Sequence, residues 1–293
     1  MTTTTTRGPA SLPIQPIGQQ QFRAAVRGAA ATILSRPVMW LLVGVWLLQV
    51  LVFAYVVNSL LAADAEAAVG INLRGEVSPF WPLASMPMYG APVFVLIGVL
   101  ASASDYRYGT LRLILPRFRS RVPFIVARWI CVLIIAVVAA IATTVLAIGS
   151  SLALSPVTDL AWVLPSVGDM VIGTASGVLI VAALATFGFT LGVMTRSVLS
   201  GLLFGLGWTI GLEVLLLPML TPLLDGLVTL RALLPGGAAG SLAGSLGESA
   251  GLNFSQTVGV TVLVEPGVAI ISLVLWTVLG ITASALVFRR RDV

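Results

Sequence analysis

The sequence has neither histidine nor lysine, and it contains a single cysteine among its 293 residues. The lack of histidine excludes a Ser-His-Asp triad, a Cys-His pair and a histidine-ligated metal site. The lack of lysine excludes a Walker A loop, because that loop places a lysine on the nucleotide phosphates. Cys131 has no partner for a disulfide within the chain, and its apolar neighbours indicate a small buried hydrophobic residue. We therefore expect no enzymatic activity in this chain, and no metal or cofactor bound by it.

Charged residues are also scarce, at 9% of the sequence, whereas hydrophobic residues make up 58%. Soluble domains are about 25% charged. The mean hydropathy of +1.07 is too high for a water-exposed fold of this length, so lipid is the expected solvent. The net charge is +5, and its positive part is carried entirely by arginine.

Six segments are long and apolar enough to cross a bilayer, which requires about 20 residues. We predict an all-α, polytopic membrane protein with transmembrane helices over residues 38–62, 83–102, 123–154, 171–194, 198–220 and 267–288. Ala63-Asp64-Ala65 resembles a signal-peptide cleavage site, but the apolar run before it far exceeds the usual 7–15 residues. The first segment is therefore interpreted as a span.

The residues before the first span differ in composition from the rest. Residues 1–21 are rich in Thr, Pro and Gln, and we predict a disordered cytoplasmic tail there. Residues 22–36 are rich in alanine, with spaced arginines, which favours an amphipathic helix at the membrane interface over a soluble helical leader. Residues 22–293 are predicted to form one transmembrane domain.

The arginines predict the orientation independently of hydropathy. Of the sixteen, only Arg74 and Arg231 lie in the connections that follow the odd-numbered spans. Acidic residues show the opposite bias and occupy those connections: Asp64, Glu66, Glu76, Asp159, Asp169, Asp225, Glu248 and Glu265. The positive-inside rule therefore places both termini in the cytoplasm, and we expect the protein in a bacterial plasma (inner) membrane. An even number of spans requires termini on the same side.

The connection between the fifth and sixth spans, residues 221–266, is unusually long. It contains an apolar stretch, residues 223–235, that is too short to span and fits a re-entrant or interfacial helix. A stretch rich in Gly, Ala and Ser follows it. A structureless loop of this length would be unusual unless it had a function.

The connection after the second span, residues 103–122, carries an ordered set of features. An acidic residue is followed by Gly-Thr, a leucine-rich turn and Ser-Arg. This order resembles the permease subunits of ABC transporters of the type-2 exporter class, except that the family's Glu is Asp here. The chain end, Phe288-Arg289-Arg290-Arg291-Asp292, and the Leu-Pro sequence at 234–235 are also similar to that family.

The resemblance implies a coupling helix that docks on a separate ATPase subunit. The residues it assigns to coupling are Asp105, Gly109, Thr110, Leu111, Arg112, Leu113, Ile114, Ser120 and Arg121. The residue types suit this role, because a short apolar ridge with a basic rim fits a groove on another protein. A basic segment lying on anionic lipid is the alternative interpretation.

Two features lie within the spans. Glu213 is an ionisable residue in the outer part of the fifth span, where it is either part of a substrate path or a protonated or paired structural residue. Small-xxx-small spacing recurs in the fourth and fifth spans and allows close helix packing, within one subunit or between two: Gly173/Gly177, Gly188/Gly192, Gly201/Gly205 and Gly207/Gly211.

The function implied by the resemblance is export of an amphiphilic substrate, such as a drug, antibiotic, peptide or lipid. ATP and Mg would be bound and used by the ATPase partner. The chain would pair with a second permease as a homodimer or heterodimer and contact membrane lipids but no nucleic acid. The alternative is a non-transporting membrane anchor or sensor. An intramembrane aspartyl protease is disfavoured, because no predicted span carries an aspartate near its centre.

Overall fold

The computed structural model describes residues 17–64, 74–107, 122–157, 162–224, 226–254 and 257–290. Every regular element in these ranges is helical. Among the described residues, six helices are long and apolar enough to cross a membrane: Pro37–Leu60, Trp81–Tyr106, Val122–Leu154, Val167–Thr195, Val198–Leu220 and Pro266–Arg290. The predicted all-α fold with six spans is therefore confirmed. The division into a tail and one transmembrane domain stays a prediction.

Three of the six spans are single α-helices, and three are composite. The single helices are α6 (Val122–Leu154), α7 (Val167–Thr195) and α12 (Pro266–Arg290). The composite spans are α2 (Pro37–Gln49), η1 (Val50–Val56) and α3 (Val57–Asp64); η3 (Trp81–Ser85), η4 (Met86–Gly90) and α4 (Ala91–Arg107); and α8 (Val198–Leu206), η7 (Gly207–Leu216) and α9 (Leu217–Leu220). The remaining elements are α1 (Ile17–Ile33), the short η6 (Ser155–Val157), α10 (Gly226–Leu233) and α11 (Pro235–Ser249).

The second and fourth spans are the most buried and form the centre of the bundle. Their backbones approach closely where glycines face the partner helix. A methyl group on Gly98 of α4 would overlap the carbonyl oxygen of Ala185, and one on Gly188 of α7 would overlap the backbone of Val95. In lipid, where apolar surface alone does not hold helices together, this close packing holds α4 against α7.

The small-xxx-small pairs divide into two groups. Both pairs of the fourth span pack within the subunit, Gly173 against Pro79 and Gly192 against Val99. Gly201 and Gly205 of the fifth span also pack against α4. At Gly207 and Gly211, by contrast, a methyl group would meet nothing within 4 Å. The pair Gly201/Gly205 in α8 therefore packs inside the subunit. The pair Gly207/Gly211 in η7 packs against no other segment of the described chain.

The first span contains a π-helical segment, η1, whose wider turn changes the usual pairing of backbone carbonyls. The carbonyl of Ala54 accepts hydrogen bonds from Trp81 Nε1 at 2.8 Å and Asn58 Nδ2 at 3.1 Å. An unsatisfied backbone group in hydrocarbon costs several kcal/mol. Trp81 and Asn58 therefore satisfy the Ala54 carbonyl within this irregular segment.

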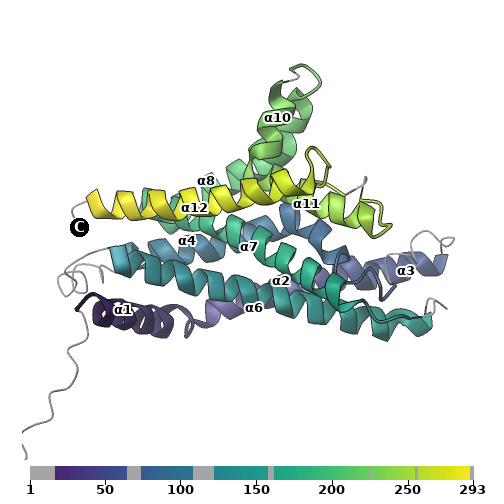
Figure 1. Ribbon diagram of the computed structural model, residues 1–293, viewed down its shortest axis with the longest axis horizontal. Coiled ribbons are helices and arrows are strands. Elements are labelled where there is room, and N and C mark those ends of the chain that lie inside the picture. The colour runs from purple at the N-terminus through teal and green to yellow at the C-terminus, as the bar shows by residue number, and fades with distance from the viewer. Residues whose placement is uncertain are drawn as a thin grey trace, which may run out of the picture.

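The two described ends of the chain lie at the same end of the bundle (Figure 1). Helix α1 packs against α6 through the buried residues Ala25, Ala29 and Ile33. Helix α11 lies toward the opposite end, and α10 projects sideways from the bundle (Figure 1). We refer to the end that holds α1 and the C-terminal part of α12 as the arginine-rich end, and to the other as the α11 end.

Candidate functional site at the arginine-rich end

Three charged side chains meet at the arginine-rich end and form what we call the Asp105 cluster: Arg36, Asp105 and Arg128. Arg36 Nη2 lies 3.1 Å from Asp105 Oδ1, and Arg128 Nη1 donates to Asp105 Oδ2. Arg128 also donates through Nε to the carbonyl of Ala101 at 2.8 Å. The two inner members are almost fully buried, with Asp105 4% and Arg128 3% exposed. The carboxylate is therefore shared between two guanidinium groups.

Each member of the cluster lies near the end of a helix. Arg36 has an extended backbone, because Pro37 follows it and begins α2. Asp105 lies in the last turns of α4, and Arg128 lies in the second turn of α6. Ser104 supports the geometry, since it accepts from Arg36 Nη1 and donates to the Leu100 carbonyl at 2.7 Å. The Asp105 cluster thus ties the start of α2 to α4 and α6.

Aromatic contacts extend the cluster to two further segments. The guanidinium of Arg128 lies 5.5 Å from the ring centre of Phe124, and Phe124 stacks on Phe288 near the end of α12 at 6.0 Å. Arg196, in the turn after α7, lies 5.9 Å from the ring centre of Tyr106. Its φ of +55° forms the left-handed cap that ends α7. Each span but the fifth therefore has a residue, in the span or at its end, in the contacts described here.

The Asp105 cluster acts through electrostatic attraction between its charged side chains. It holds two positive charges and one negative charge at low exposure, and charge-assisted hydrogen bonds of this kind are the strong ones. Within the described ranges, no three His, Cys, Asp or Glu side chains lie together in a way that could hold a metal ion. The cluster can fix the relative positions of α2, α4 and α6.

Of the residues that the sequence assigned to coupling, the structure describes one, Asp105. The others lie in residues 108–121, outside the described part of the chain. Asp105 precedes that segment in the sequence and Arg128 follows it, so the ion pair between them joins the two helices on either side of it. The sequence did not single out Arg36 and Arg128 as partners of Asp105. The only signal for Arg128 was its position inside an apolar run that forms a span.

Glu213 forms a second polar site, in the π-helical part of the fifth span, and is 2% exposed. Its Oε2 accepts from the backbone N–H groups of Gly236 at 2.6 Å and Gly237 at 3.1 Å. These residues begin α11 directly after Pro235, and the first amides of a helix have no partner within it. Glu213, which belongs to the fifth span, therefore caps the start of α11. Its other oxygen, Oε1, has no hydrogen-bond partner among the described residues.

Arg231 of α10 lies within electrostatic reach of Glu213. Burial lowers the pKa of Arg231, and the Glu213 carboxylate acts in the opposite direction. Its Nη2 group donates to Thr261 Oγ1 at 3.3 Å. Arg231 is one of the two arginines in the connections that are otherwise rich in acidic residues. It thus offsets part of the charge on Glu213, where the fifth span meets α10 and α11.

In comparisons with known proteins, the chain matches no family model and no curated sequence. A functional conclusion therefore depends on the six spans, the distribution of arginine and the Asp105 cluster.

Proposed function

We propose that the chain is the transmembrane subunit of an ATP-driven ABC exporter of the type-2 class, moving an amphiphilic substrate across a plasma membrane. The observation that carries the proposal is the Asp105 cluster. It joins the two helices that bracket residues 108–121, the segment expected to dock on an ATPase. A force on that segment would act on α4 and α6 together, because Asp105 and Arg128 are bonded to each other.

In the proposed exporter, the ATPase and the transmembrane subunit have separate roles. The ATPase subunit binds ATP and Mg and closes around them. The segment 108–121 transmits that movement to α4 and α6, and the spans shift between inward-open and outward-open arrangements. Since α4 packs on α7 at backbone distance, a movement of α4 reaches the centre of the bundle. The working unit pairs this chain with a second permease.

The docking role is tested by placing a charge in the apolar ridge. Leu111→Asp and Leu113→Asp, made together, should abolish co-purification of the ATPase subunit with the tagged chain. The reason is that burying an unpaired carboxylate in an interface costs several kcal/mol. The measurement is the amount of ATPase recovered after gentle solubilisation of native membranes.

Val163→Asp is the matched control, because Val163 is exposed in the connection before α7, on the other side of the predicted membrane. It introduces the same kind of charge, one carboxylate where the ridge variant has two, and should leave ATPase recovery unchanged. Equal recovery from the ridge variant and wild type would contradict the docking role. Recovery of no ATPase with wild type would favour the membrane anchor or sensor.

A further inference from the structure

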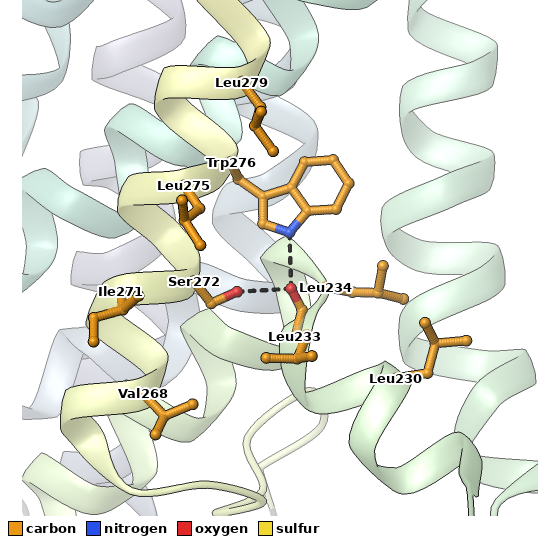
Figure 2. Close-up of a pocket in the computed structure, with 9 residues that line it drawn as sticks. All are labelled: Leu230, Leu233, Leu234, Val268, Ile271, Ser272, Leu275, Trp276 and Leu279. Carbon is orange, nitrogen blue, oxygen red and sulfur yellow. Dashed lines mark hydrogen bonds between the residues drawn. The ribbon is translucent and has the colours of Figure 1, made fainter.

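A groove runs along α12 where this helix faces the end of α10 (Figure 2). Its volume is about 370 Å³, within the 300–1,000 Å³ typical of ligand pockets. One wall is formed by Val268, Ile271, Leu275 and Leu279 of α12, and the other by Leu230 and Leu234. The walls come from different elements, so the groove lies between packed helices of the fold.

The polar groups in the groove bond to one another. The carbonyl of Leu233, at the end of α10, accepts from Ser272 Oγ at 2.7 Å and from Trp276 Nε1 at 2.8 Å (Figure 2). The remaining lining side chains are aliphatic, and none of the lining residues is charged. A polar ligand group would find no free partner here and would lose its own hydrogen bonds. The surface offered is therefore hydrocarbon.

The groove follows the membrane direction over the depth of one leaflet. From Val268 to Leu279 the helix rises about 17 Å at 1.5 Å per residue. Half of a hydrocarbon core of about 30 Å is roughly 15 Å. Val268 is the third residue of α12, so the groove begins at the α11 end of the span and runs toward the middle of the membrane. This is the depth that the acyl chain of a lipid occupies.

The cross-section of the groove distinguishes an acyl chain from a helix of a second copy. Counting its open side, the groove holds about 780 Å³ of empty space, which over about 17 Å corresponds to a width of about 7 Å. A single hydrocarbon chain fits this width, since carbon atoms pack about 3.5–4.0 Å apart. A helix with its side chains is about 10–12 Å across and does not enter.

We propose that this groove binds one acyl chain of a phospholipid of the surrounding bilayer, in the leaflet at the α11 end. The bound chain fills the space between α12 and α10 and keeps the Leu233 carbonyl and its two donors away from water. This site does not depend on the exporter function, because it requires only that the chain spans a membrane.

The test uses purified protein in liposomes of phosphatidylethanolamine and phosphatidylglycerol, doped with a phospholipid that carries a diazirine on one acyl chain. After irradiation, cross-linked peptides are located by mass spectrometry. We expect labelling to concentrate on the groove residues of α12 and α10. Leu275→Trp and, from the opposite wall, Leu230→Trp should each lower it severalfold, because the indole fills the groove.

Ile270→Trp is the matched control, since Ile270 lies on another face of the same helix and is 41% exposed. It should leave labelling of the groove unchanged. Two variants from opposite walls guard against the misfolding of either one. Labelling spread evenly around α12, or labelling that both groove variants leave intact, would overturn the proposal. Labelling of other lipid-facing residues with none at the groove residues, as expected if a second copy of the chain covers the groove, would also overturn it.

Discussion

Asp105→Ala is expected to destabilise the protein by about 3–5 kcal/mol, the cost of removing one partner from a buried ion pair. The physical reason is that Arg128, 3% exposed, would keep its charge without its carboxylate. Arg36 would lose its partner as well, but it contributes less because its side chain is 26% exposed. Thermal unfolding in mild detergent measures the loss, and recovery of the ATPase partner measures its effect on docking.

Asp169→Ala is the control for loss of a carboxylate. Asp169 is half-buried in the first turn of α7, where its carboxylate accepts from Ser166 Oγ at 2.7 Å. Favourable charge at a helix start is worth about 0.3–1 kcal/mol, so a small effect is expected. The double variant Asp105→Ala with Arg128→Ala should lose less than the sum of the single variants, since no buried charge is then left alone. Strictly additive losses, or no loss in Asp105→Ala, would show that the cluster does not hold these helices.

Glu213→Ala should loosen α11 and give the second large effect. The substitution leaves the N–H groups of Gly236 and Gly237 without the acceptor they have in the structure. A buried donor left unsatisfied costs about 1–3 kcal/mol. The expected result is faster amide hydrogen exchange across the first half of α11, with little change in α4 and α7. Exchange followed by mass spectrometry in detergent or nanodiscs measures it.

Glu213→Gln provides the comparison, because its amide oxygen can still accept from the two N–H groups while the charge is gone. Protection of α11 close to wild type is expected for this variant. If alanine and glutamine are equally harmful, the charge matters more than the hydrogen bonds, and the cap on α11 does not explain Glu213. Unchanged exchange in the alanine variant would contradict the cap as well.

The six spans could be predicted from the sequence because lipid imposes one simple requirement, about 20 apolar residues per crossing. Val198–Leu220 shows that the requirement can be met by a segment with irregular backbone and an ionisable residue. It was recognised as a span although it contains Glu213, a proline and the ten-residue π-helical segment η7, since its overall hydropathy still meets the requirement. Length and hydropathy average over such local features.

The Asp105 cluster could be predicted only in part. Asp105 stood out because of its place in the motif, but its partners lie 69 and 23 residues away along the chain. The positive-inside rule treats all arginines near a cytoplasmic connection alike, so it does not separate Arg128, which turns inward, from the others. The pairing depends on how α2, α4 and α6 pack, and sequence spacing does not contain that information.

Helix α11 was missed for a different reason. Its glycines and serines lower the helix propensity that its alanines would raise, and its many small residues resemble those of a connection. In the structure these small residues are almost all buried, and several approach the backbone of neighbouring segments, as Gly240 does with Gly259. Pro235 after Leu234, together with an acidic residue in the preceding span, was the available signal for a capped helix start.

The arrangement of the six spans, with the arginine-rich end facing the cytoplasm, is tested by cysteine labelling in intact cells. The background is Cys131→Ala, which removes the native cysteine, itself fully buried. Single cysteines are then introduced as Ser249→Cys, at the exposed end of α11, and Ser120→Cys, in the segment proposed to dock on the ATPase. A membrane-impermeant thiol reagent should label the cysteine at 249 in intact cells and the one at 120 only in inverted vesicles. Labelling of both positions from the same side would contradict this topology and, with it, the proposed exporter.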